Sequence, residues 1–214
     1  MNKSLVISIF NGIVKLLYFP PLFLTVIHFK EIGLNGTQIG LIFALSTFVS
    51  ILTILPSGIS SDKIKAKYLV SIGLFLMGTQ FFFLYQSQNF WIILTFMLLG
   101  GLGTTIYNTS TDSLFFKNSG DDQVNKKIGI YNGIKYFSIA IGLFLGGYFL
   151  HQNISFEKLF LYLSISFGIL TLLATLILNS NTTSDFSILH YKKDILNKKV
   201  LFFLLIVFLF ALHW

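Results

Sequence analysis

The ionisable side chain that lies deepest in an apolar segment of this sequence is Lys15. It shares one helix face with Asn11 and Tyr18, because the spacing is i, i+4 and i+7. A charge in such a place is costly and marks a functional candidate. The ammonium would attract an anionic solute or balance a carboxylate elsewhere; the alternatives are pairing inside the protein and extension toward a membrane interface. Pro20 and Pro21 follow and predict a kink or break in the helix.

A second polar stripe consists of Thr104 or Thr105, Asn108 and Asp112, again at helical spacing. These residue types can bind a polar solute within an apolar segment. Asp112 lies near the end of its segment, so a carboxylate among lipid headgroups and a partner for Lys67 or Lys135 are the structural alternatives. Lys135 is itself close enough to a segment end for its stem to reach the headgroups.

Motifs for catalysis or metal binding are absent from the sequence. It has no cysteine, its four histidines show no metal-ligand spacing, and it contains neither a glycine-rich phosphate loop nor a Gly-x-Ser-x-Gly turn. We therefore expect no catalytic residue, no metal and no cofactor, and predict that the protein is not an enzyme.

The elements that carry these side chains are predicted to be membrane-spanning helices. The 214-residue chain is 54% hydrophobic and 11% charged, less than half the charged share of about 25% in soluble domains. A bilayer core needs about 20 apolar residues per helix. Six segments meet that length and predict an all-α, multi-pass bundle: about 4–27, 37–57, 69–86, 90–114, 128–150 and 157–178.

A longer polar stretch divides the chain into unequal parts. We expect a six-helix bundle over 1–178, a cytoplasmic loop over 179–199, and the start of a seventh helix over 200–214. Fifteen helical residues reach only about 22 Å, so the seventh span is predicted to be incomplete.

The distribution of the lysines predicts the orientation in the membrane. All fifteen basic residues are lysine, and placing the N-terminus in the cytoplasm puts eleven of them inside and only Lys30 and Lys158 outside, with Lys15 and Lys135 in spans. This is the positive-inside pattern. It explains the net charge of +7 without nucleic acid as a partner, and predicts a bacterial cytoplasmic membrane protein with a cytoplasmic N-terminus.

The short loop between the second and third spans reads Gly58-Ile-Ser-Ser-Asp62-Lys63-Ile-Lys65-Ala-Lys67. Glycine, then aspartate four residues later, then basic residues, resembles the signature loop of the major facilitator superfamily. Lys65 stands where that family has a second glycine, and Ala66 where it has a basic residue. The ordinary alternative is an inside loop whose lysines only set orientation.

The resemblance implies half of a twelve-helix secondary transporter, in which two six-helix bundles of 3+3 repeats rock around a central site. It implies a gating role for Gly58, Asp62, Lys63, Lys67 and Asp112. It also implies that the first and fourth spans line the cavity, so that Asn11, Lys15, Tyr18, Thr104 and Asn108 become cavity candidates.

The fifth span is rich in glycine at Gly133, Gly142, Gly146 and Gly147. The Gly142-x-x-x-Gly146 spacing permits a close approach of two helices, so we assign these four residues to helix packing. No proline follows Gly146, whereas exporters of the family carry a Gly-Pro element here, which disfavours a drug/proton antiporter.

Two hypotheses about function come from these patterns. The first is a permease that moves a small polar or anionic solute by alternating access, with a coupling ion, the lipid bilayer and a missing C-terminal bundle as its partners. The second is a membrane protein that does not transport, either a degenerate relic or an assembly partner of another permease.

Overall fold

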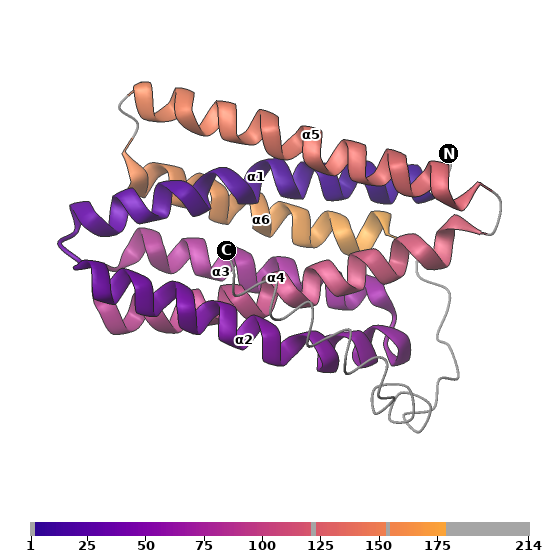
Figure 1. The fold of residues 1–214 in the computed structure, drawn as a ribbon, viewed down its shortest axis with the longest axis horizontal. Coiled ribbons are helices and arrows are strands. Elements are labelled where there is room, and N and C mark those ends of the chain that lie inside the picture. Colours follow the sequence, from indigo (N-terminus) through magenta and orange to yellow (C-terminus); the bar gives the residue numbers. More distant parts are fainter. Residues whose placement is uncertain (1–2, 121–122, 153–154, 179–214) are drawn as a thin grey trace, which may run out of the picture.

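The protein forms an antiparallel bundle of long helices (Figure 1). The computed structural model describes residues 3–120, 123–152 and 155–178. The predicted loop at 179–199 and the seventh span at 200–214 lie outside these described residues. Within them the elements are all helical: α1 (Lys3–Glu31), α2 (Gly36–Lys63), α3 (Ala66–Gln86), α4 (Phe90–Ser119), α5 (Val124–His151) and α6 (Phe156–Ile177). Each is long and apolar enough to cross a membrane, which confirms the predicted fold class.

Asparagine side chains start two of these helices. Before α2, Asn35 Oδ1 accepts from the Gln38 amide N–H at 2.9 Å, and Gln38 Oε1 accepts from the Asn35 amide N–H at 3.0 Å. This reciprocal pair satisfies amide groups that have no partner inside the helix. Before α4, Asn89 Oδ1 accepts from the Trp91 amide at 2.9 Å. The helix starts at the bundle ends are therefore fixed by local sequence.

The helices pair in a crossed pattern. α3 packs against α4 and α6, α1 packs against α5, and α2 packs against α4. When α1–α3 and α4–α6 are taken as two sets of three helices, the second helix of each set lies against the first helix of the other set. That arrangement is the one that an internal 3+3 repeat would produce.

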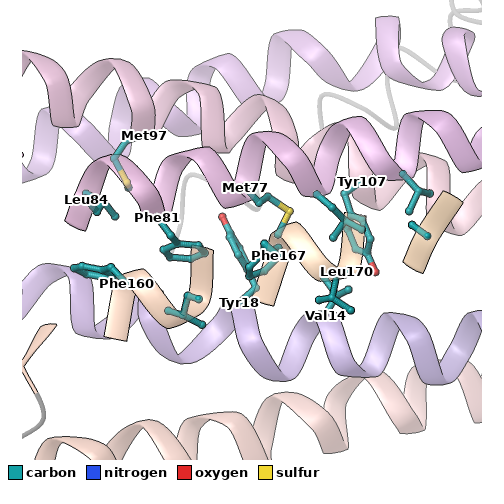
Figure 2. Packing of buried hydrophobic residues seen from close by; sticks show 14 of the residues in the cluster. Val14, Tyr18, Met77, Phe81, Leu84, Met97, Tyr107, Phe160, Phe167 and Leu170 are labelled. Carbon is teal, nitrogen blue, oxygen red and sulfur yellow. The ribbon is translucent and has the colours of Figure 1, made fainter. Parts of the chain in front are cut away.

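The apolar core lies where α1, α3, α4 and α6 meet (Figure 2). Phe81 of α3 is fully buried, with its ring centroid 5.5 Å from that of Phe167 and 6.1 Å from that of Tyr18. By contrast, only 11% of the most apolar window of α2, and of α5, is buried. These two helices present most of their surface outward.

α2 is attached to α4 by small polar residues. Ser46 Oγ donates to the Met97 carbonyl oxygen at 3.0 Å, and Ser50 Oγ donates to that of Gly101 at 3.1 Å. A Cβ atom on Gly101 would lie 2.7 Å from Ser46 Oγ. Small residues and hydroxyls of this kind hold helices together in lipid, where apolar surface alone gives no preference for a neighbour.

α1 continues through Pro20 and Pro21 as one helix, so of the two predicted outcomes, a kink or a break, the break does not occur. Pro20 has no N–H to donate to the Leu16 carbonyl. That carbonyl faces α5, where a Cβ atom on Gly142 would lie 2.5 Å from its oxygen, and one on Gly146 would lie 2.8 Å from Pro20 Cβ. α5 supports α1 at the point where its own hydrogen bonding is interrupted.

The bundle ends differ in charge. One end carries these lysines of the described residues: Lys3, Lys63, Lys65, Lys67, Lys117, Lys126 and Lys127. The opposite end carries Lys30 and Lys158, each beside a glutamate, Glu31 and Glu157. The first end is the one predicted to face the cytoplasm.

Cysteine labelling tests this orientation, and the chain has no native cysteine to interfere. Lys65 and Gln88 are exposed in loops at opposite ends of the bundle. In intact cells we expect a membrane-impermeant maleimide to label Gln88→Cys and to label Lys65→Cys only after permeabilisation, because the lysine-rich end faces inward. Labelling in the reverse order would contradict the orientation.

The contact between α1 and α5 gives a second prediction. Gly142→Ala should lower the apparent melting temperature in detergent by about 5 °C, since overpacking costs roughly 1–3 kcal/mol and each kcal/mol shifts the melting point by about 2–4 °C. Gly147→Ala is the matched control, because a Cβ atom there meets nothing within 4 Å. Equal melting temperatures for the two variants would count against the contact.

Candidate functional site

The two predicted polar stripes meet each other between α1 and α4. Lys15 Nζ donates to Asn108 Oδ1 at 2.6 Å. One turn along, the hydroxyls of Thr104 and Tyr18 are 2.8 Å apart. These two pairs bring together four of the five residues that the sequence assigned to a cavity.

Asn11, the fifth of those residues, is bound by a tyrosine that the sequence analysis did not single out. The fully buried Tyr107 donates from its hydroxyl to Asn11 Oδ1 at 2.9 Å. The ring of Tyr107 also lies 5.6 Å from Lys15 Nζ, within the range of a cation–π contact. We call Asn11, Lys15, Tyr18, Thr104, Tyr107 and Asn108 the α1–α4 polar cluster.

Lys15 is buried in this cluster, with 5% of its surface exposed. No carboxylate of the described residues lies within 4 Å of its ammonium. The charged groups that act on it from further away are Asp112 of α4 and Lys135 of α5. The buried ammonium of Lys15 therefore has a neutral hydrogen-bond acceptor and no counter-ion in direct contact among the described residues.

The hydrogen-bond partner of Asp112 is a tyrosine of α5, and its carboxylate forms no ion pair with a lysine of the described residues. Tyr131 donates from its hydroxyl to Asp112 Oδ1 at 2.6 Å, and no lysine in the described segments comes within 4 Å of this carboxylate. Lys135 lies over the ring of Tyr136, and Lys67 over that of Tyr68. A short bond to a charged acceptor is of the stronger kind, so Asp112 joins α4 to α5.

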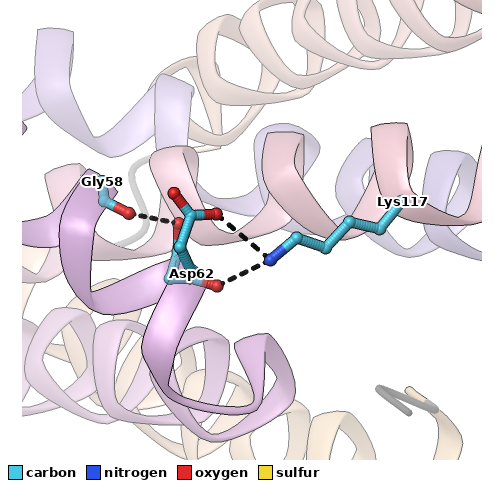
Figure 3. Close-up of polar contacts among 4 residues, drawn as sticks. Gly58, Asp62 and Lys117 are labelled. Atoms are coloured by element: carbon cyan, nitrogen blue, oxygen red, sulfur yellow. Dashed lines mark hydrogen bonds and ion pairs between the residues drawn. The ribbon is translucent and has the colours of Figure 1, made fainter. Parts of the chain in front are cut away.

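Asp62 is paired with the end of α4 (Figure 3). Lys117 Nζ lies 3.2 Å from Asp62 Oδ1 and donates to the Ser61 carbonyl oxygen at 3.0 Å. Ser61 Oγ in turn donates to the Gly58 carbonyl oxygen at 2.8 Å. The last turn of α2 is thereby tied to the last turn of α4, while Lys63 is exposed to the surroundings.

Two of the four predicted packing glycines lie in the contact with α1, and two do not. Gly142 and Gly146 face Leu16 and Pro20, whereas a Cβ atom at Gly133 or Gly147 would meet nothing within 4 Å. The difference arises because the four residues lie on different faces of α5, which the sequence spacing alone does not orient.

A cleft of about 410 Å³ opens beside the polar cluster, toward the end of the bundle that carries Lys30. It is lined by α1, α2, α3 and α4 through Tyr18, Phe19, Leu22, Phe23, Val26, Phe43, Ser46, Thr47, Gln80 and Met97. Tyr18 belongs to both the cleft and the cluster, and Phe19 lies 5.8 Å from Lys15 Nζ. The cleft is thus aromatic, with a buried cation one helical turn away.

Sequence reasoning missed Lys117, Tyr107, Tyr131 and Gln80. In the sequence pattern Lys117 contributes only to the orientation in the membrane, and the tyrosines resemble other aromatic residues in apolar helices. Gln80 gave a usable signal, since it is a polar amide within an apolar segment. No group of three potential metal ligands occurs among the residues that the structure describes.

Reversing the pair at the ends of α2 and α4 tests its contribution. Asp62→Lys and Lys117→Asp should each lower the thermal stability in detergent, and the double variant should recover part of the loss, since it restores opposite charges at the same separation. Half-buried pairs couple by roughly 0.2–1 kcal/mol, and more at low salt. The exposed Lys63→Asp is the control. Additive losses in the double variant would show that the pair does not couple.

Known proteins resemble this chain, one of them over most of its length and another over less than half of it. The family model described as Major Facilitator Superfamily matches residues 4–214. The quinolone resistance protein NorA of Staphylococcus aureus is 24% identical over 196 residues, which cover 87% of this chain and 48% of that protein. The bacillibactin exporter of Bacillus subtilis strain 168 is 25% identical over 84 residues, 39% of this chain and 21% of that protein. The chain spans about half the length of the quinolone resistance protein.

The family match extends over all the described helices and agrees with their all-helical, membrane-spanning character. The chain belongs to the Major Facilitator Superfamily.

Proposed function

We propose that this chain is the N-terminal half of a secondary transporter that moves a small organic solute across the bacterial cytoplasmic membrane. Family membership supports transport as the function. One six-helix bundle leaves α2 and α5 largely uncovered, which fits a partner bundle that completes a central site. The relatives are named for quinolone resistance and for bacillibactin export, and both names favour a small organic solute.

The solute that suits this half-site is amphipathic and carries an acidic group. The cleft offers aromatic side chains on α1 and α2, including Phe19, Phe23 and Phe43, to a flat apolar body. Lys15 lies one turn deeper, where its hydrogen-bond acceptor is the neutral amide of Asn108. A buried charge without a counter-ion costs free energy, so an anionic group that reaches Lys15 would offset that cost. This observation carries the proposed preference for an anion.

Alternating access needs a contact that can open and close at the cytoplasmic end. The pair between Asp62 and Lys117 joins the ends of α2 and α4 there, and the bond between Asp112 and Tyr131 joins α4 to α5. In our proposal these contacts, with Gly58, Lys63 and Lys67, stabilise one state of the cycle and are exchanged as the bundles rock.

Transport of two related probes tests the role of Lys15. In proteoliposomes that hold this chain together with its second bundle, we expect saturable transport of acridone-2-carboxylate. Lys15→Gln should raise its half-saturation concentration about tenfold, because a hydrogen bond to a charged group contributes roughly 1.5–3 kcal/mol. Transport of uncharged acridone should be unaffected.

The exposed Lys30→Gln is the matched control, since it removes one positive charge at the outer end of α1. An unchanged half-saturation concentration in Lys15→Gln would refute the anion preference while leaving transport intact. Failure to observe saturable transport of either probe would refute the proposed function itself.

A further inference from the structure

A second cavity of this bundle, of about 200 Å³, is an apolar groove lined by α1, α5 and α6. α5 and α6 each contact α1 (Figure 1), but in the described segments they hardly contact each other. The side chains along the groove are all apolar, and they include Leu17, Pro21 and Leu24 of α1, Leu145 and Phe149 of α5, and Leu159 of α6. We call this feature the α1–α5–α6 groove.

The groove and the cleft lie on opposite faces of α1. Leu22 and Val26 line the cleft, whereas Pro20 and Leu24 line the groove. The two pairs are offset by two residues, which is more than half of a helical turn of about 3.6 residues. The α1–α5–α6 groove is therefore separate from the cleft in which we place the solute.

The groove opens to the surroundings of the bundle, because Phe149 in its wall is 38% exposed and Leu145 and Leu159 are half-buried. At this depth the surroundings of a spanning helix are hydrocarbon. Water does not fill an apolar space, and an apolar cavity of about 150 Å³ can hold a molecule of the size of benzene. An empty groove would lose van der Waals contacts along its open side, so a lipid acyl chain is the group that suits it.

The length of the groove agrees with that occupant. Its lining residues on α1 extend from Leu16 to Leu24, about 12 Å along the helix axis. The hydrocarbon of one leaflet is about 15 Å thick. The groove can therefore hold most of one acyl chain that runs parallel to the helices.

A cation stands at the end of the groove. Leu159 in its wall directly follows Lys158, and Phe149 lies two residues before the end of α5 at His151. Lys158 is exposed, and no carboxylate of the described residues lies within 4 Å of its ammonium. A lysine at a span end can extend to a lipid phosphate. The groove and Lys158 thus have the arrangement of the tail and the headgroup of one phospholipid.

We propose that the α1–α5–α6 groove binds one phospholipid from the leaflet around the Lys158 end, with an acyl chain in the groove and the phosphate beside Lys158. The chain packs against α1, α5 and α6 together and supplies contacts that α5 and α6 do not make with each other. This inference goes beyond the proposed function, since the groove takes a bound lipid and not the transported solute.

Lipid binding by the purified chain in detergent tests the inference. Dioleoylphosphatidylglycerol is anionic, and dioleoylphosphatidylcholine has the same acyl chains with a zwitterionic headgroup. Each lipid is titrated separately, and the lipid-bound fraction is measured by native mass spectrometry. We expect one molecule to bind more tightly than any further one. Phosphatidylglycerol should bind about twofold to fivefold more tightly than phosphatidylcholine, which is the range of an exposed ion pair.

A larger side chain in the groove should compete with the acyl chain. Leu145→Trp should weaken the first binding step of both lipids by about tenfold, because the added ring occupies the groove. Leu143→Trp is the matched control, since Leu143 lies on the same helix, is 40% exposed and does not line the groove. It should bind both lipids as the natural chain does.

Removal of the cation tests the headgroup without altering the groove. Lys158→Gln should remove the preference for phosphatidylglycerol and leave the binding of phosphatidylcholine almost unchanged. The control is Lys126→Gln, which removes an exposed lysine at the opposite end of the bundle. This control should keep the preference.

Several outcomes would overturn the inference. Equal binding by Leu145→Trp and Leu143→Trp would show that the lipid lies outside the groove. A preference that persists in Lys158→Gln, or that is lost in Lys126→Gln, would refute the position of the headgroup. If Leu145→Trp does not fold, the exposed Lys158→Gln still decides. None of these results depends on transport, which the acridone-2-carboxylate experiment tests separately.

Discussion

The contact between α1 and α4 through buried polar side chains is the interaction on which the rest of this bundle depends. Inside a membrane each polar group must find a partner within the protein. Asn11, Lys15 and Tyr18 of α1 find theirs on α4. Because these bonds require one rotation of each helix, they also fix which side of α1 faces the cleft. The position of Phe19 and of the cleft wall follows from that rotation.

Small residues then determine which helices approach these two. α2 packs closely against α4 at Gly101, beside Ser46. α5 packs closely against α1 at Gly142, beside the Leu16 carbonyl oxygen, which has no helical N–H donor because residue 20 is a proline. Lipid offers no hydrophobic preference for one neighbour over another, so close packing and hydrogen bonds select the pairs. The crossed pairing of α2 with α4 and of α5 with α1 is therefore encoded by glycines and serines, while bulky apolar residues cover the surfaces that face lipid.

The sequence was sufficient to predict the six helices of the described residues, their approximate limits and the two polar stripes, because apolar length and helical spacing are local properties. It could not predict which polar groups would pair. Asp112 binds Tyr131, and Asp62 binds Lys117, and both choices depend on the rotation and crossing of separate helices. Likewise Gly142 and Gly133 are equivalent as residues, and only the packing of α5 distinguishes them.

In the proposed transport cycle, the charge of Lys15 would connect the cleft to the movement of the helices. Asp112 attracts its ammonium only from a distance, and Lys135 repels it. An anionic solute that approaches Lys15 would bind most tightly to the conformation in which other protein groups compensate this charge least. A ligand shifts the equilibrium between two conformations only by the difference in its affinity for them. Asp112 is itself bound to α5 through Tyr131. A change in the position of α5 relative to α4 would therefore alter the electrostatic environment of Lys15. In the proposed cycle, solute binding and helix movement would then act on the same buried charge.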